Sequence, residues 1–156
     1  MKPEIANVNN LQVNHSQVAI KEVIWQNAEH ALRAVRTPVF IQEQLVTPEF
    51  EWDGKDASAV HLLALSGEEA IACLRIINDQ KIGRMAVLKD WRGMGIGMAL
   101  IQKALEIIKN NGEASAYLSA QTHAIGFYER AGFVVTSEEY CDVDIPHVDM
   151  EYQFVK

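Results

Sequence analysis

A glycine-rich stretch in the middle of the chain constrains the fold more than any other feature. The run Gly83–Gly97 has the sequence GRMAVLKDWRGMGIG, in which strand-like residues lead into three glycines within five positions. A helical apolar pattern follows, at Gly97, Ile101, Ala104, Leu105 and Ile108. Glycine permits positive φ and close backbone approach, and a helix N-terminus offers free N–H groups and a positive partial charge. This order predicts an anion site, most often for phosphate.

The charge distribution supports an anionic ligand at this stretch only. The segment from Lys81 to Lys109 contains six basic residues and two acidic ones, although the whole chain carries a net charge of -7. A strongly acidic chain disfavours nucleic acid as a partner. No apolar run approaches the ~18 residues of a membrane span, and the first residues lack a signal-peptide core. Cys73 and Cys141 form no C-x-x-C motif. We therefore expect a reduced, cytoplasmic protein with no nucleic acid and no membrane partner.

Length and hydropathy predict one α/β domain. The 156 residues, 49% of them apolar, suit a single domain over 1–156, with residues 1–10 expected to be loose. The pattern predicts strands at 17–25, 60–65, 70–78, 82–88, 114–120, 133–136 and 148–154. It predicts helices at 26–36, from 95 to the stop signal at Asn111-Gly112, and at 122–131, with loops at 49–58 and between the last two strands. Short turns make the three middle strands an antiparallel meander within a mixed sheet.

Two nucleotide-binding motifs fit the glycine run poorly. A P-loop needs Lys and Ser or Thr after its last glycine, but Met98 and Ala99 follow Gly97. A dinucleotide fingerprint needs its third glycine at position 98, which is also Met98. A nucleotide-binding protein is therefore a disfavoured alternative. The run by itself also allows a simple glycine turn that caps a core helix.

Motifs elsewhere in the chain identify a family. Arg92–Gly97, as R-x-x-G-x-G, resembles the pyrophosphate loop of the GNAT superfamily of acetyl-CoA-dependent N-acetyltransferases. Ala124–Phe133, AIGFYERAGF, is similar to the family pattern A-x-x-F-Y-E-K-x-G-F. Three further segments resemble the ElaA/YjcF-like branch: VFIQEQ at 39–44, Ala120-Gln121, and DIPHVDM at 144–150 with Asp in place of the usual Gly. The resemblance covers about residues 17–152. It implies a single-domain GNAT fold, with a mixed and mostly antiparallel central sheet of about seven strands and helices on both faces.

The resemblance also implies a set of site residues. The acetyl-CoA pyrophosphate would lie on backbone N–H groups of Arg92, Gly93, Met94, Gly95, Ile96 and Gly97, as the physics of the loop suggests independently. The pantetheine arm would lie between the splayed fourth and fifth strands, beside Met85, Ala86 and Val87. One of Met85 and Val87 is also expected to pack in the core. Gln121 and Phe127 would also contact acetyl-CoA. Tyr128 occupies the family's general-acid position, which would protonate the departing CoA thiolate; its alternative is a core aromatic. No metal is implied.

The acceptor and the general base stay open. Base candidates are Glu43, Asp53, Glu139, His147 or a water molecule, whereas His61 suits the core and His123 the rim. The implied reaction is direct acetyl transfer to a primary amine of a small molecule or peptide. The acidic runs 43–56 and 138–151 would favour a cationic acceptor unless they are solvated loop charge. The alternative to an enzyme is an acyl-CoA-binding sensor without turnover. Homodimers are common in the family, so the resemblance allows one.

Overall fold

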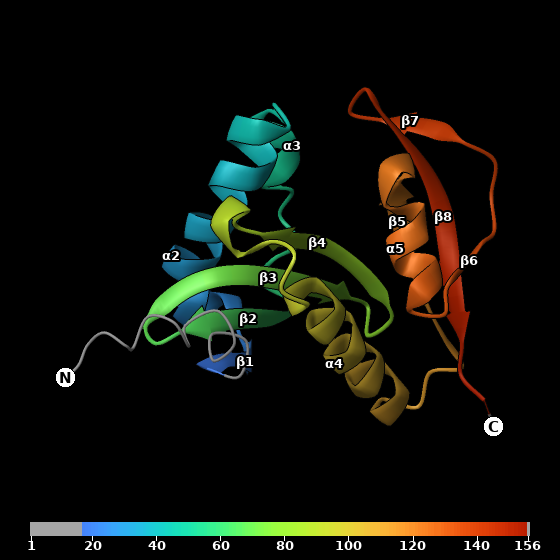
Figure 1. Cartoon of the computed structure of the whole chain (residues 1–156), viewed down its shortest axis with the longest axis horizontal. Coiled ribbons are helices and arrows are strands. Elements are labelled where there is room, and N and C mark those ends of the chain that lie inside the picture. Colours follow the sequence, from blue (N-terminus) through green and yellow to red (C-terminus); the bar gives the residue numbers. More distant parts are fainter. Residues whose placement is uncertain (1–16, 156) are drawn as a thin grey trace.

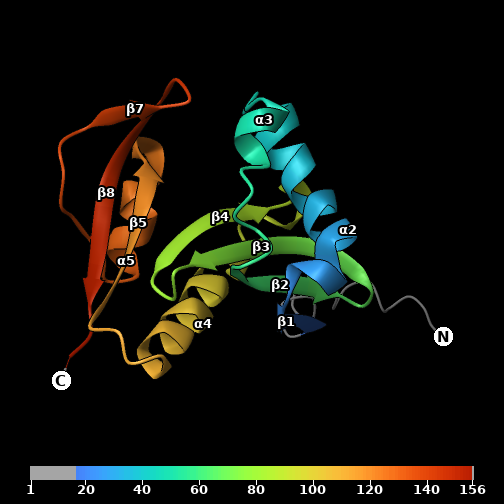
Figure 2. The ribbon, with the colours of Figure 1, turned by 180° about the vertical axis from the view of Figure 1, so that it is seen from behind.

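The computed structural model describes residues 17–155, which build an eight-stranded sheet with helices on both faces (Figures 1 and 2). The expectation for residues 1–10 lies outside the described residues. The strands are β1 Val18–Val23, β2 Val60–Ser66, β3 Glu69–Ile77, β4 Lys81–Val87, β5 Ser115–Gln121, β6 Val134–Val135, β7 Tyr140–Asp142 and β8 Ile145–Gln153. The helices are α2 Trp25–Arg36, α3 Pro48–Glu51, α4 Ile96–Asn110 and α5 Ile125–Arg130, with a π-helical segment at Thr37–Glu43.

The strand order confirms the predicted mixed sheet. The order is β1-β2-β3-β4-β5-β8-β6, with β7 added on β8, and every pair is antiparallel except β4 with β5. The predicted meander corresponds to β2, β3 and β4. Strand β7 was not predicted, because it lies in the acidic loop and none of its three residues is buried. A two-residue turn joins it to β8, with φ of 45° at Val143 and 65° at Asp144. Asp tolerates this left-handed backbone, so the turn forms without the usual glycine.

Two apolar layers hold the helices to the sheet. On one face α4 buries Ile96, Leu100, Ile101, Ala104 and Ile108 against the strands. The predicted apolar stripe of α4 is therefore confirmed at its centre, while Gly97 and Leu105 lie half-buried at its edges. On the other face α2 packs Leu32 and Val35 against Cys73 and Ala86. None of the helices between residues 17 and 155 is long and apolar enough to cross a membrane.

The sheet splits in its middle. Strands β4 and β5 pair only at Lys81 with Tyr117 and at Ile82 with Leu118. Beyond these pairs the strands diverge, and β4 curves away from β5 and α5 (Figure 1). Within the described residues the β4 edge that faces β5 is therefore unpaired from Gly83 onward. The predicted splay between the fourth and fifth strands is present.

A buried ionic network ties α2 and α3 to β3. Arg36, which is 1% exposed, donates to Glu51 Oε2 and to Asp56 Oδ1, both at 2.7 Å. Arg75 donates to the same Asp56 oxygen at 3.0 Å, and His61 Nε2 lies 3.0 Å from the Asp56 carbonyl oxygen. His61 is thus the core histidine expected. The segment 49–58, predicted as a loop, begins with helix α3 because Pro48 suits a first helical turn.

Removing Asp56 should strongly destabilise the fold. In Asp56→Ala two buried guanidinium groups, those of Arg36 and Arg75, would each lose a carboxylate partner. Breaking a buried ion pair on one side costs about 3–5 kcal/mol. The control is Glu29→Ala, which breaks an exposed i,i+4 pair with Arg33 at 2.8 Å and should cost about 0.3–0.5 kcal/mol. Urea unfolding of both variants measures the difference, and equal losses would contradict the role given to the network.

The effect of Asp56 should depend on pH. Burial acts to raise the pKa of Asp56, but hydrogen bonds from Arg36 and Arg75 outweigh it and hold that pKa below its usual value. A carboxyl with a lowered folded-state pKa stabilises the fold above its unfolded value of about 3.9, and this contribution fades as the pH falls further. The stability gap between the wild type and Asp56→Ala should therefore narrow in acid.

Candidate active site

The glycine run forms an open amide cradle at the start of α4. Gly95 is the N-cap residue of α4, with φ of 82° and no side-chain cap, and Gly93 has φ of 80°. Within the described residues the amides of 93–98 donate no hydrogen bond, and the first helical bond runs from Ala99 N to Gly95 O at 3.0 Å. Several free N–H groups at a helix N-terminus suit an anionic group such as a pyrophosphate.

The other loop residues hold this cradle in place. Arg92 Nε donates to the Val87 carbonyl oxygen, and its Nη2 bonds Glu43 Oε1, both at 2.8 Å. The Ile96 side chain is 2% exposed and belongs to the core, so only its amide is available. A Cβ on Gly97 would lie 3.4 Å from the Phe127 ring. Gly97 therefore lets Phe127 pack directly against the first turn of α4.

Strand β4 places its residues on both faces of the sheet. Met85 and Val87 pack with the α4 layer, whereas Ala86 lies 3% exposed in the α2 layer. Core packing was expected of one of Met85 and Val87, and both pack against the core while remaining partly exposed. The Ala86 side chain is buried in the other layer, so only its backbone could contact a pantetheine arm. The register with β3 leaves one extra residue on β4 between Gly83 and Ala86, which is a β-bulge. Arg84 in this bulge has φ of 46°, a strained value for a large side chain.

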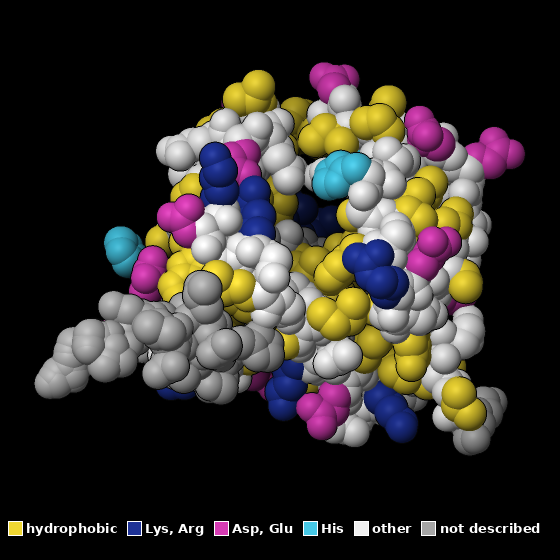
Figure 3. Space-filling model, viewed as in Figure 1, with side chains coloured by type: hydrophobic (Ala, Val, Ile, Leu, Met, Phe, Trp, Pro, Cys, Tyr) yellow, Lys and Arg dark blue, Asp and Glu magenta, His cyan; other side chains and the backbone are white. Residues whose placement is uncertain are grey.

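The divergence of β4 and β5 opens a cleft of about 460 Å³. Gly83, Arg84 and Met85 line it from β4, and Gln121, Tyr128 and His147 line it from the other half. A hollow is visible between the two halves from the α4 side, with basic side chains deep inside it (Figure 3). The Gln121 amide donates to Gln44 Oε1 at 2.8 Å and so bridges the two walls. The same amide's oxygen lies 2.7 Å from His123 Nε2.

Tyr128 projects into the cleft opposite β4. Its ring contacts Phe127 and Phe133 edge to face, with centroids 5.1 and 6.0 Å away. The Tyr128 hydroxyl has no hydrogen-bond partner in the described part of the chain. The hydroxyl is also not fully buried, so it is accessible from the cleft. Burial raises the pKa of Tyr128 to about 12. The phenol therefore stays protonated near neutral pH and can donate a hydrogen bond to an anion.

The geometry separates the base candidates. Glu43 is bound to Arg92, and Glu139 is exposed and lies outside the cleft lining. Burial acts to raise the pKa of Asp53, but Arg75, the Lys55 amide and Arg84 outweigh it and hold that pKa well below its usual range. His147 lines the cleft at 7% exposure, and its Nδ1 lies 2.7 Å from the Ile145 carbonyl oxygen. Because a carbonyl only accepts, Nδ1 must carry the proton, which leaves Nε2 of the neutral ring free to accept one.

The acidic runs 43–56 and 138–151 contribute three acids to the cleft lining, Glu51, Asp53 and Asp142. Of the acids in 43–56, Glu51, Asp53 and Asp56 are bound to arginines and Glu43 to Arg92. Of the acids in 138–151, only Asp142 lines the cleft. The cations that line it are Lys55, Arg75, Lys81 and Arg84. Sequence patterns assigned Arg36, Arg75 and Lys81 no part in the site. Arg36 ends the predicted helix 26–36, Arg75 lies inside the predicted strand 70–78, and Lys81 was only one of six basic residues in 81–109.

The chain matches a family and its solved structures over most of its length. The model of the acetyltransferase (GNAT) domain matches residues 23–154. The uncharacterized N-acetyltransferase YjcF of Bacillus subtilis is 39% identical over 138 residues, 84% of this chain and 98% of that protein. The crystal structure of Escherichia coli ElaA has a TM-score of 0.79 at 29% identity and covers 87% of this chain and 99% of its own.

A more distant relative was solved with a ligand. The PaiA N-acetyltransferase of Thermoplasma acidophilum, in complex with coenzyme A, shares the fold with a TM-score of 0.65 at 17% identity, over 88% of this chain and 99% of its own. The cradle, the split sheet and these matches confirm the resemblance to the ElaA/YjcF-like branch and the predicted fold. The chain belongs to the GNAT acetyltransferase family.

Proposed function

We propose that the protein is an acetyl-CoA-dependent N-acetyltransferase that moves the acetyl group directly to a primary amine. The observation that carries the proposal is the arrangement of one cleft. The unpaired β4 edge lies on one wall of this cleft, and Tyr128 and His147 lie on the other. The open amide cradle lies beside the cleft, where Gly97 approaches Phe127 and also Met85, which lines the cleft. The cradle suits the pyrophosphate, and the β4 edge suits the amide groups of the pantetheine arm.

His147 is the proposed general base. Its Nε2 would take a proton from the attacking amine, either directly or through a water molecule, as the nitrogen bonds to the acetyl carbon. The hydrogen bond to Ile145 fixes the tautomer that this step needs. A free amide on the β4 edge would donate to the carbonyl oxygen, where negative charge develops.

Tyr128 is proposed to stabilise the departing thiolate. When the bond between the acetyl carbon and sulfur breaks, the sulfur carries a negative charge, and the phenol is placed to donate a hydrogen bond or a proton to it. A thiol ionises near a pKa of about 8.5, well below that of this phenol. The hydrogen bond is therefore the main contribution, and the sulfur takes its proton finally from solvent.

The competing function is an acyl-CoA sensor without turnover. A sensor would need the cradle to bind acyl-CoA, but it would not need a phenol or an imidazole beside the reacting group. The cleft has a phenol at Tyr128 and an imidazole at His147, which favours the enzyme. The test is CoA release, followed with a free-thiol reagent, from acetyl-CoA and a panel of small amines, amino acids and peptides. Amine-dependent release supports the enzyme. Tight acetyl-CoA binding without release from any amine would support the sensor.

Replacing His147 should slow turnover. In His147→Gln the side chain stays polar but cannot take the amine proton, so kcat/KM for the best amine should fall about 10²- to 10⁴-fold. Acetyl-CoA affinity, measured by calorimetry, should stay the same. The control is His30→Gln on the exposed side of α2, which should keep wild-type rates. If His147→Gln keeps them too, water or another group is the base.

A further inference from the structure

The two faces of the sheet assign a side of the cleft to each substrate. The amide cradle begins α4, and Met85 packs toward Gly97 on the same face. Ile82 belongs to the α4 layer, so its neighbours Lys81 and Gly83 face the opposite side, where α3 lies. Acetyl-CoA therefore enters from the α4 side, and the acceptor side is formed by α3, Lys81, the β4 bulge and the β7–β8 turn.

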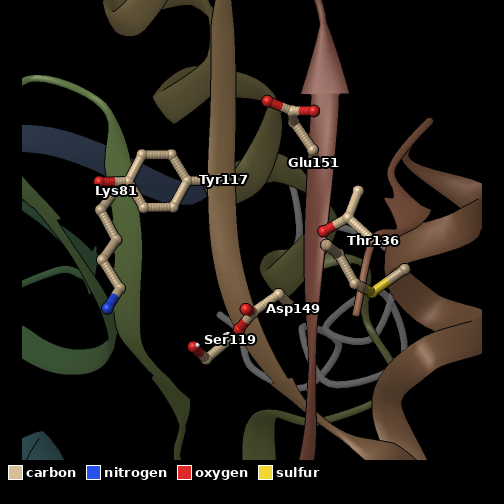
Figure 4. A pocket seen from close by; sticks show the side chains of 7 residues that line it. Lys81, Tyr117, Ser119, Thr136, Asp149 and Glu151 are labelled. Atoms are coloured by element: carbon tan, nitrogen blue, oxygen red, sulfur yellow. Dashed lines mark hydrogen bonds between the residues drawn. The ribbon is translucent and has the colours of Figure 1, made fainter. Parts of the chain in front are cut away.

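Lys81 is an uncompensated cation on the acceptor side. It is half-buried, and no carboxylate of the described residues lies within ion-pair distance of it. It borders both the cleft and a neighbouring hollow of about 310 Å³. Its side chain extends along β4 toward the Ser119 end of that hollow, whereas Glu151 lies at the other end (Figure 4). Asp149, the second acid there, accepts the Tyr140 hydroxyl at 2.6 Å. Both acids lie on β8, with β5 between them and β4.

Arg84 adds a fixed donor further along β4. Its Nη2 donates to the Phe50 and Glu51 carbonyl oxygens and to Asp53 Oδ2, each at 3.1 Å. Its Nη1 makes no hydrogen bond to any residue between 17 and 155, and the residue lines the cleft. The three arginines of the network are matched by Glu51, Asp53 and Asp56. The other charged residues of the cleft lining are Lys55, Lys81 and Asp142, which leave one net positive charge.

We propose that the acceptor amine carries a carboxylate, which the Lys81 ammonium and Arg84 Nη1 bind on the α3 side of the cleft. This rests on the proposed N-acetyltransferase function and names its substrate class. A half-buried ammonium without a counter-charge is poorly solvated, and a substrate carboxylate would supply the missing partner. A single excess positive charge matches a carboxylate better than a phosphate, which carries about -1.5 to -2 charges at neutral pH.

The test compares matched amines that differ only in the carboxylate. The pairs are γ-aminobutyrate with propylamine and phenylalanine with phenethylamine, with a diamine, putrescine, as the cationic counterpart. A charge-assisted contact predicts a kcat/KM about 10- to 100-fold higher for the carboxylate member of at least one pair. In Lys81→Met this ratio should fall close to one, and Lys81→Arg should largely restore it. The control Lys103→Met, on the exposed side of α4, should keep the wild-type ratio.

Two results would overturn the proposal. One is a higher wild-type kcat/KM for the plain amine or for putrescine than for every amine that carries a carboxylate. This comparison uses the wild type alone, so it does not depend on whether a variant folds. The other is a carboxylate preference that Lys81→Met leaves intact. Absence of CoA release from every amine would instead count against the proposed function. Binding then decides the carboxylate separately: with CoA present, N-acetyl-γ-aminobutyrate should raise the melting temperature more than N-acetylpropylamine, and equal shifts would overturn the proposal.

Discussion

Acetyl-CoA affinity should fall about 10²- to 10⁴-fold in Gly95→Val. Gly95 is the N-cap of α4, with its amide and those beside it free to donate. A β-branched side chain here would block the approach of a pyrophosphate to the cradle. The loss of two hydrogen bonds to a charged group, each worth about 1.5–3 kcal/mol, gives this range. Isothermal titration with acetyl-CoA measures it.

The matched control lies at the other end of the same helix. Gly112 and Gly95 share a left-handed backbone, with φ of 89° and 82° respectively. A Cβ on Gly112 would have no heavy atom of a non-adjacent residue within 4 Å. Valine at either position must adopt a left-handed backbone at a cost of about 1–2 kcal/mol, which a fold of ordinary stability tolerates. Gly112→Val should therefore share the stability loss but keep full affinity. Equal acetyl-CoA affinities in the two variants would contradict the assignment of the pyrophosphate to the cradle.

Turnover should fall in Tyr128→Phe, by about 10²-fold and at most 10⁴-fold. The ring contacts with Phe127 and Phe133 remain, so folding and acetyl-CoA affinity should be preserved. Only the donor to the thiolate is lost, and this interaction strengthens when charge develops on sulfur. The effect should therefore lie in kcat more than in KM. A thiolate is a tolerable leaving group near neutral pH, which favours the lower end of the range.

The control for this change is Tyr152→Phe on β8. Tyr152 packs against Phe133 from outside the cleft, so losing its hydroxyl should leave kcat unchanged. Because the pKa of Tyr128 is raised to about 12, its ionisation should not limit the wild-type rate between pH 7 and 9. A Tyr128→Phe enzyme within about twofold of the wild type would make Tyr128 a core aromatic without a part in catalysis.

The elements that the sequence predicted well are those with strong periodicity and clear stop signals. The α4 stripe ends at Asn111-Gly112, and the meander of β2, β3 and β4 is separated by turns that are easily recognised. The glycine run placed the cradle correctly because free amides follow from the order of strand, glycine turn and helix alone. Predicted boundaries differ from the observed ones by a few residues, as at β8, which begins at Ile145.

The charge pattern of the cleft could not be predicted, because it depends on contacts between distant segments. The acids at Glu51, Asp53 and Asp56 suggested a negative surface, yet they bind arginines from α2, β3 and β4. Arg36 is buried although it lies at the polar-looking end of α2, since its partners arrive 15 and 20 residues later. Strand β7 is short and exposed, so its residues carry no alternating apolar pattern.

The most direct test of the central claim is the fate of the acetyl group. The enzyme is incubated with acetyl-CoA labelled with carbon-13 in both acetyl carbons and with the best amine of the panel, and the products are separated by mass spectrometry. We predict an N-acetylated amine that carries both labelled carbons, formed in equal amount to free CoA and reduced in parallel in Tyr128→Phe. Bound but intact acetyl-CoA, or labelled acetate without an acetylated amine, would contradict direct transfer to an amine.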